Sequence, residues 1–207
     1  MFVWGTDDPP SCRVLWKLLK QGWIVFDVGA HHGFYTLLAS AKVGQKGLVI
    51  AFEPSPHELQ RLLRHLRLNR CSNVYVESIA LADFIGIAEF YVGLGSHNAL
   101  NSLQNPPKGI PYRRIVVPVT TLDRYISQRM INNVDLIKID VEGAELLVLK
   151  GAKNLLQKLP RPIIVCEFID DWMERFGYKG KEFYEFLREH KYQCFRATNE
   201  EKLQAIM

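Results

Sequence analysis

The feature that most constrains this chain is an apolar run that ends in an acid and a glycine turn, the segment IVFDVGAHHG. The run predicts a strand over Ile24–Val28, a turn through Gly29 and a helix that opens just past Gly33. A second apolar run over Leu48–Phe52 predicts another strand, and Glu53 follows it directly. A strand, glycine turn, helix and second strand that ends in an acid predict a nucleotide-binding βαβ unit.

The side chains of this loop discriminate between ligands. A dinucleotide fingerprint needs a middle glycine so that the backbone can approach a pyrophosphate, but here His31 stands two residues after Gly29. Asp27 would repel a pyrophosphate, whereas it would attract the ammonium and sulfonium of S-adenosylmethionine. Glu53 would hold the ribose by two charge-assisted hydrogen bonds. The loop therefore predicts S-adenosylmethionine rather than NAD, the plainer alternative being an ordinary turn with an incidental acid.

Composition agrees with one soluble domain. The 207 residues suffice for one α/β core, so we expect a single domain over 1–207. A net charge of +4 is too small to indicate nucleic acid, and no nucleic-acid partner is expected. Four cysteines without a C-x-x-C pair, no apolar run of about 18–20 residues and no signal-peptide pattern predict a cytoplasmic protein without a membrane span.

Predicted helices and strands alternate along the chain. The expected helices are Ser11–Gln21, Gly33–Val43, Pro56–Asn69, Leu122–Ser127, Ala144–Leu156 and Lys181–His190. The expected strands are Ile24–Val28, Leu48–Phe52, Asn73–Glu77, Asp135–Asp140, Pro162–Phe168 and Gln193–Ala197. Two further alternating runs, Gly86–Val92 and Arg113–Thr120, predict a β insertion after the third strand, extending over the upper edge of the sheet. This alternation of strands and helices predicts a doubly wound α/β fold, in which a mostly parallel sheet carries helices on both faces.

Acids mark the ends of the predicted strands. Ligands of open α/β sheets bind outside the carboxyl ends of the strands. Asp140 follows such a strand, and Gly143 then permits a tight turn into a helix. Asp140 is therefore a candidate site residue, and the alternative is a helix-capping acid. The two roles can coexist.

The chain resembles, over nearly its whole length, the FkbM family of S-adenosylmethionine-dependent methyltransferases. The segments that carry the resemblance are FDVGAHHGFYTLLAS, VIAFEPSPHELQRLLRHLRLN, IALAD, VTTLDRYI, DLIKIDVEGAELLVLKGA and GYKGKEFYEFL. AFEP and KIDVEGAE at this spacing are specific to the family, whereas DVGA alone indicates only the wider methyltransferase superfamily.

The resemblance implies a Rossmann-like class I methyltransferase with a seven-stranded sheet, which O-methylates small-molecule or sugar hydroxyls. It also implies a cofactor site. Asp27, Gly29 and Gly33 would contact the methionine part of the cofactor, and Ala30 and His31 belong to the same loop. Glu53 would hold the ribose, Pro54, Ala80 and Leu81 would contact the adenine, and Asp140 would lie near the reactive methyl. Two departures stand out. His32 replaces a more usual apolar residue, and the seventh strand is expected to be very short or missing.

The sequence leaves the general base open. His31, His97 and Asp140 are candidates, and we take Asp140 and His97 as the catalytic residues. A metal-assisted mechanism would use Asp140 with Glu167 or Asp170. No metal is expected, because no paired Asp-Asn accompanies the fifth strand.

Asn105-Pro106-Pro107 is similar to the amine-binding loop of amino-methyltransferases, but it precedes the fourth strand and is interpreted as a turn. This argues against N-methylation and favours a small-molecule or glycan hydroxyl. The alternatives are a nucleic-acid or protein methyltransferase and a non-catalytic cofactor-binding protein. The acceptor itself and the oligomeric state are not predicted.

Overall fold

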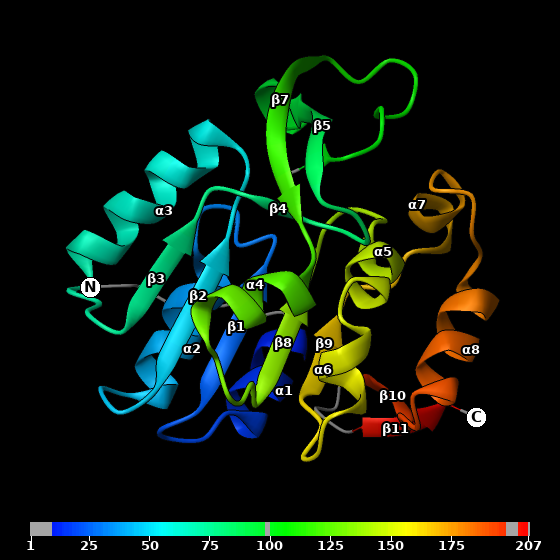
Figure 1. Ribbon diagram of the computed structural model, residues 1–207. Coiled ribbons are helices and arrows are strands. Elements are labelled where there is room, and N and C mark those ends of the chain that lie inside the picture. The colour runs from blue at the N-terminus through cyan, green and yellow to red at the C-terminus, as the bar shows by residue number, and fades with distance from the viewer. Residues whose placement is uncertain (1–9, 98–99, 198–202, 207) are drawn as a thin grey trace.

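A five-stranded parallel sheet forms the centre of the computed structural model, which describes residues 10–97, 100–197 and 203–206 (Figure 1). The strands are ordered β3-β2-β1-β8-β9. Their bounds are β1 Ile24–Val28, β2 Leu48–Phe52, β3 Val74–Glu77, β8 Leu136–Ile139 and β9 Ile163–Cys166. The predicted doubly wound fold is confirmed.

Helices cover both faces of this sheet. One face carries α1 Pro10–Leu18, α2 Phe34–Val43 and α3 Pro56–Leu68, and the other carries α4 Leu122–Arg129, α5 Glu145–Lys150, α6 Lys153–Gln157 and α8 Gly180–Glu189. Successive residues of a strand point to opposite faces. Val25 and Val49 therefore pack with α1 and α2, while Phe26 and Ile50 pack with α4, α5, α6 and α8. In the described part of the chain, no helix is long and apolar enough to cross a bilayer.

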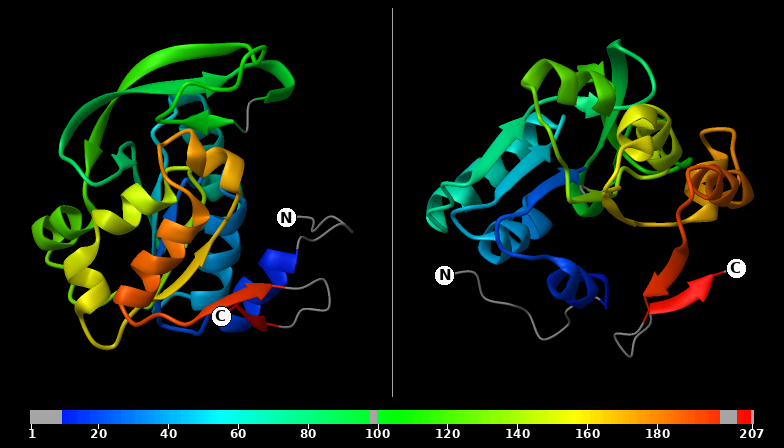
Figure 2. Two further views of the ribbon diagram at one scale, coloured as in Figure 1. Left: turned by 90° about the vertical axis from the view of Figure 1, so that its right-hand side faces the viewer. Right: turned by 60° about the horizontal axis from the view of Figure 1, so that its bottom comes forward.

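The predicted β insertion is a sheet of its own, which lies above the carboxyl ends of the central strands (Figure 1, and Figure 2, left). Its strands, in the order β4-β7-β5-β6, are β4 Ala80–Leu81, β5 Gly86–Gly93, β6 Asn101–Ser102 and β7 Tyr112–Thr120. Phe90 and Val117 belong to its apolar core, against which Leu147 of α5 packs. The insertion is thereby anchored beside the loop that follows β8.

The predicted helix Ala144–Leu156 was wrong in one respect, because the chain forms two helices, α5 and α6, that meet at Gly151. A Cβ atom at Gly151 would lie 2.1 Å from the carbonyl oxygen of Ala82. The carbonyl of Gly151 accepts a hydrogen bond from Asp123 N at 2.9 Å. The Asp123 carboxylate then accepts from the first turn of α6, at Asn154 N and Leu155 N. Contacts from α4 and the insertion fix this bend.

The seven-stranded sheet implied by the resemblance is also not what the structure shows. Strands β10 Cys194–Ala197 and β11 Leu203–Ile206 pair with each other in an antiparallel ladder, separate from the central sheet. The five-residue helix α7, Asp170–Glu174, was not predicted, since so short a segment gives no periodic signal.

Candidate functional site

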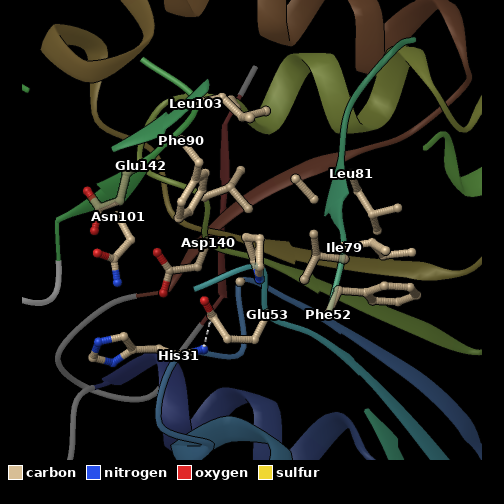
Figure 3. A pocket seen from close by; sticks show the side chains of 16 residues that line it. His31, Phe52, Glu53, Ile79, Leu81, Phe90, Asn101, Leu103, Asp140 and Glu142 are labelled. Carbon is tan, nitrogen blue, oxygen red and sulfur yellow. Dashed lines mark hydrogen bonds between the residues drawn. The ribbon is translucent and has the colours of Figure 1, made fainter. Parts of the chain in front are cut away.

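A cleft lies where the carboxyl ends of β1, β2 and β8 meet the insertion (Figure 3). Its volume is about 710 Å³, including solvent at its open mouth. The walls come from the loop after β1, the end of β2, strands β4 to β6 of the insertion and the loop after β8. The cleft thus lies between the carboxyl ends of the strands and the insertion, where the sequence predicts a ligand site.

Most of the predicted site residues share this cleft. Those that line it are Gly29, His31, Glu53, Pro54, Ala80, Leu81 and Asp140. Asp27 and Ala30 are buried behind the wall, and Gly33 faces the side chain of Leu62. His97 belongs to the 3-10 turn Gly95–His97 and is not among the described residues that line the cleft. The structure therefore does not bring His97 to the place expected of a catalytic base.

Gly29 holds the strand ends together at the base of the cleft. Its φ of 76° lies in the left-handed region, and a Cβ atom there would stand 1.8 Å from the carbonyl oxygen of Asp140. Its N–H donates to Phe52 O at 3.1 Å. A side chain at this position is therefore excluded both by the backbone conformation and by the close approach of the loop after β8.

Glu53 is buried at the end of β2, with 3% of its surface exposed. Its two carboxylate oxygens accept hydrogen bonds from His31 N at 2.7 Å and Ser55 N at 2.8 Å. Burial raises the pKa of Glu53 to about 7, although the N–H groups of Ser55 and His31 favour the charged form. This acid therefore also fixes the cofactor loop, as the dashed line to His31 in Figure 3 shows.

A buried lysine that sequence reasoning missed lies beneath the loop. The ammonium of Lys138 is 3.2 Å from Asp27 Oδ1 and 3.4 Å from Asp140 Oδ2, and it donates to Gly29 O at 3.0 Å. Burial opposes its charge, but the carboxylates of Asp27 and Asp140 outweigh this and raise the pKa of Lys138 above its ordinary value. The only sequence signal is one lysine in the apolar strand LIKI.

Asp27 is consequently a buried partner of this lysine. It is 1% exposed, and its second oxygen accepts from Thr36 Oγ1 at 2.6 Å. The ammonium of Lys138 lies between Asp27 and the cleft-lining Asp140, so the charge that the sequence assigned to attracting a cationic ligand already has a cationic partner. Asp27 lies behind the cleft wall. It holds the ammonium of Lys138, which in turn holds the carbonyl of Gly29 at the base of the cleft.

Three carboxylates gather on the β8 side of the cleft. Oxygens of Asp140, Glu142 and Glu167 lie within 4.8 Å of one another. Burial and the charge of Asp140 raise the pKa of Glu142 to about 8 and that of Glu167 to about 7. Asp170, the other acid considered for a metal, instead accepts a hydrogen bond from Gly180 N.

The loop after β8 is fixed by groups other than Asp140. The N-cap residue of α5 is Ala144, and the Glu145 carboxylate accepts from Val141 N at 3.1 Å and Gly143 N at 3.2 Å. The hydroxyl of Tyr178 donates to Gly143 O. Asp140 is therefore not the helix cap of the alternative interpretation, and its side chain, 33% exposed, faces the cleft.

The insertion supplies cleft residues that the sequence did not single out, namely Phe90, Asn101 and Leu103. Figure 3 shows Asn101 and Glu142 on one side of the cleft, with Ile79 and Leu81 on the other. Ser102 Oγ donates to Glu142 O at 3.1 Å, which links the insertion to the loop after β8. The alternation in the β5 run was the only available signal, because it marks residues such as Phe90 as inward-facing.

Fold and cleft together define a Rossmann-like, doubly wound α/β domain with a ligand-sized cleft at the carboxyl ends of its strands. A solved structure of a putative rRNA methylase from Clostridium thermocellum superimposes with a TM-score of 0.57 at 12% identity, covering 99% of this chain and 100% of that one. At this identity the likeness concerns the fold alone.

Sequence comparison gives the family. The methyltransferase FkbM domain matches residues 27–194. The chain is 27% identical to Methyltransferase 1 of Beauveria bassiana, over 61% of this chain and 57% of that protein. It is 24% identical to the hexuronic acid methyltransferase AglP of Haloferax volcanii, over 71% of this chain and 57% of that protein. The chain thus spans little more than half the length of these relatives. It belongs to the FkbM family of S-adenosylmethionine-dependent methyltransferases, which confirms the resemblance.

Proposed function

We propose that this chain, acting as one domain, transfers a methyl group from S-adenosylmethionine to a hydroxyl of a small molecule or glycan. In this proposal the methionine part of the cofactor contacts the loop at Gly29 and His31, and the ribose contacts Glu53. Pro54, Ala80 and Leu81 provide the apolar contacts of the adenine. The cofactor supplies an electrophilic methyl group, and the chain supplies its position relative to the acceptor.

The observation that carries the proposal is the placement of Asp140. Its carboxylate lines the cleft while the ammonium of Lys138, buried behind it, holds it in place. Methyl transfer forms an oxygen–carbon bond as the carbon–sulfur bond breaks, and the acceptor hydroxyl loses its proton. A fixed carboxylate can orient that hydroxyl and accept the proton. Asp140 meets both requirements, so we assign it as the catalytic residue.

The loop after β8 favours oxygen over nitrogen as the acceptor atom. Its residues are Asp140, Val141, Glu142 and Gly143, whereas Asn105-Pro106-Pro107 lies between β6 and β7 in the insertion. The carbonyl of Asn105 accepts from the Arg175 side chain, so this triplet serves as a contact of the insertion with the segment after α7. Similarity to a protein named for hexuronic acid methylation adds support for a sugar acceptor.

Turnover to S-adenosylhomocysteine with separate acceptor fractions tests the proposal. We would supply S-adenosylmethionine with oligosaccharides that contain hexuronic acids, small alcohols, lipids and RNA, and then locate the methyl group by mass spectrometry. We expect turnover with a glycan or small-molecule fraction and a methyl group on oxygen. Methylation of RNA alone, or cofactor binding without turnover on any fraction, would contradict the proposal.

A further inference from the structure

Four of the six histidines of the chain gather beside the cofactor loop, around one buried carboxylate. His31 and His32 lie in the loop after β1, while His57 and His65 belong to α3. The carboxylate is Glu58, also on α3, whose side chain is 1% exposed. The proposed methyl transfer uses none of these side chains except that of His31, which lines the cleft.

The side chains of His31, His32 and Glu58 are arranged around a common centre. His31 Nε2 is 3.3 Å from Glu58 Oε2, and His31 Nδ1 is 2.7 Å from His32 Nδ1. One ligand atom from each of the three residues lies within 4.8 Å of the others. His65 Nδ1 contacts His32 O at 2.7 Å, which ties the loop to α3 from a second direction. Two segments of the chain thus bring two imidazoles and a carboxylate close enough to share one cation.

These donors match a specific class of cation. Two imidazoles and a carboxylate suit Zn²⁺ and related first-row cations, whereas Mg²⁺ and Ca²⁺ prefer oxygen ligands alone. Tetrahedral coordination at lengths of about 2.0–2.2 Å places ligand atoms roughly 3.3 Å apart. The separation of His31 Nε2 and Glu58 Oε2 already has this value. The contact of His31 with His32 uses the other ring nitrogen, Nδ1, so the His32 ring has to turn toward His31 Nε2 for all three donors to reach one cation.

We propose that His31, His32 and Glu58 form a binding site for Zn²⁺ or a related first-row transition-metal cation. The site differs from the carboxylates of Asp140, Glu142 and Glu167, which offer oxygen only. It also adjoins the cofactor loop, since the main-chain N–H of His31 donates to Glu53 Oε2 at 2.7 Å. A cation on the His31 side chain would therefore fix the segment that positions Glu53.

Arg61 provides an internal test, because it competes for the same carboxylate. Its Nη1 is 2.9 Å from Glu58 Oε2 and 3.2 Å from Glu58 Oε1. The guanidinium opposes a second positive charge at this place, but the side chain is 39% exposed and can turn into solvent. Arg61→Gln should therefore tighten metal binding, whereas loss of a ligand should weaken it.

The experiment is a calorimetric titration of the metal-stripped, tag-free protein with ZnCl₂, paired with absorption spectra of the Co²⁺-loaded protein. We expect one equivalent of Zn²⁺ and the visible bands of tetrahedral Co²⁺. Both should weaken by at least about tenfold in His31→Gln, His32→Gln and Glu58→Gln. His190→Gln is the matched control, because that imidazole lies on the far helix α8 against Phe186 O.

Two results would overturn the site. One is Zn²⁺ uptake that persists in the His31→Gln/His32→Gln double variant, which keeps Glu58 and its pairing with Arg61 and so protects the fold. The other is uptake that disappears in Glu142→Gln/Glu167→Gln but not in the histidine variants. Circular dichroism of every variant establishes that the comparison is made between folded proteins. This test does not depend on the proposed methyl transfer, since it reads metal binding alone.

Discussion

The two sides of the cleft are built in different ways. On the side where we propose that the cofactor binds, here called the cofactor side, the ends of β1 and β2 are joined by local contacts. Gly29 N and Ala30 N donate to Phe52 O, and His31 N donates to the Glu53 carboxylate. On the side proposed for the acceptor, here called the acceptor side, the loop after β8 is held by Glu145, Tyr178 and Ser102, which come from α5, the segment after α7 and the insertion. A site built from one βαβ unit can be predicted from local sequence patterns, whereas a site assembled from distant segments can be recognised only once the fold is known.

The two sides also differ in charge. Glu53 stands alone at the end of β2, and burial is the main cause of its raised pKa. Asp140, Glu142 and Glu167 stand together, and the charge of Asp140 adds to burial in raising the pKa values of Glu142 and Glu167. On the cofactor side Glu53 is thus held by N–H groups, whereas on the acceptor side three carboxylates lie close together and one of them, Asp140, is paired with a lysine.

Replacing Asp140 should give the largest effect on activity. The variant distinguishes the two sides because turnover should fall while cofactor binding is largely kept. Asp140→Asn keeps the shape but loses the charge, and we expect turnover to fall about 10²–10⁴-fold. Cofactor affinity should change far less than turnover, because the main-chain hydrogen bonds of Gly29 and Ala30 to Phe52 O are kept. Single-turnover rates and calorimetry measure the two quantities, with His97→Ala as the control. Wild-type turnover in the Asn variant, together with loss in the control, would move the catalytic role to His97.

Replacing Gly29 should break the contact between the two sides. Gly29→Ala meets both a left-handed φ and the carbonyl of Asp140, so we expect it to lose about 3–5 kcal/mol of unfolding free energy. The control is Gly22→Ala, where φ is 80° but nothing lies within 4 Å of the added Cβ. That variant should lose only about 1–2 kcal/mol. Equal losses in urea unfolding would show that the close approach to Asp140 is unimportant.

Removing the acid of the cofactor side should affect binding rather than chemistry. Glu53→Ala should weaken S-adenosylmethionine binding by about 1.5–3 kcal/mol, the value of hydrogen bonds to a charged group. This corresponds to an increase in Kd of roughly tenfold to a hundredfold. Turnover at saturating cofactor should be largely kept. Glu89→Ala, which removes an exposed acid of the insertion, serves as the control. Unchanged affinity in the Glu53 variant would mean that another group holds the ribose.

The buried acid of the cofactor side should also be visible in the pH dependence of stability. The folded-state pKa of Glu53, about 7, is raised from 4.5, so its stabilising contribution is fully present below pH 4.5 and is lost as pH rises through 7. Relative to wild type, Glu53→Gln should gain roughly 1–3 kcal/mol between pH 5 and 8. Urea unfolding of the free protein at both pH values measures this. A difference that does not vary with pH would show that Glu53 is ionised throughout.

The smallest expected effect concerns Mg²⁺ on the acceptor side. Raised pKa values leave Glu142 and Glu167 partly protonated near neutral pH, and protons compete with a metal for carboxylate oxygens. Adding Mg²⁺ to chelator-treated protein should therefore change turnover by less than about twofold. A strong dependence on Mg²⁺ that disappears in Glu167→Gln would instead identify the three carboxylates as a metal site.

How far the sequence predicts this molecule depends on the range of the interactions involved. The predicted bounds of β1 and β2 match the structure, since each is a buried apolar run that ends in local turn signals. The bend at Gly151 depends on Ala82 and Asp123, and no local pattern encodes such contacts. Lys138 is the clearest case. Its pairing with Asp27 arises only from the register of β1 with β8, in which these two residues are opposite each other.

That register makes one ammonium common to both halves of the cleft. Asp27 and Asp140 share the charge of Lys138, so a ligand that draws Asp140 toward itself changes the field in which Asp27 and the carbonyl of Gly29 are held. The binding of the methyl donor and that of the acceptor would then be coupled electrostatically through Lys138. Such coupling is reciprocal: the factor by which the bound donor changes the affinity for the acceptor equals the factor by which the bound acceptor changes the affinity for the donor. A single cross-strand ion pair would thus couple the two binding events.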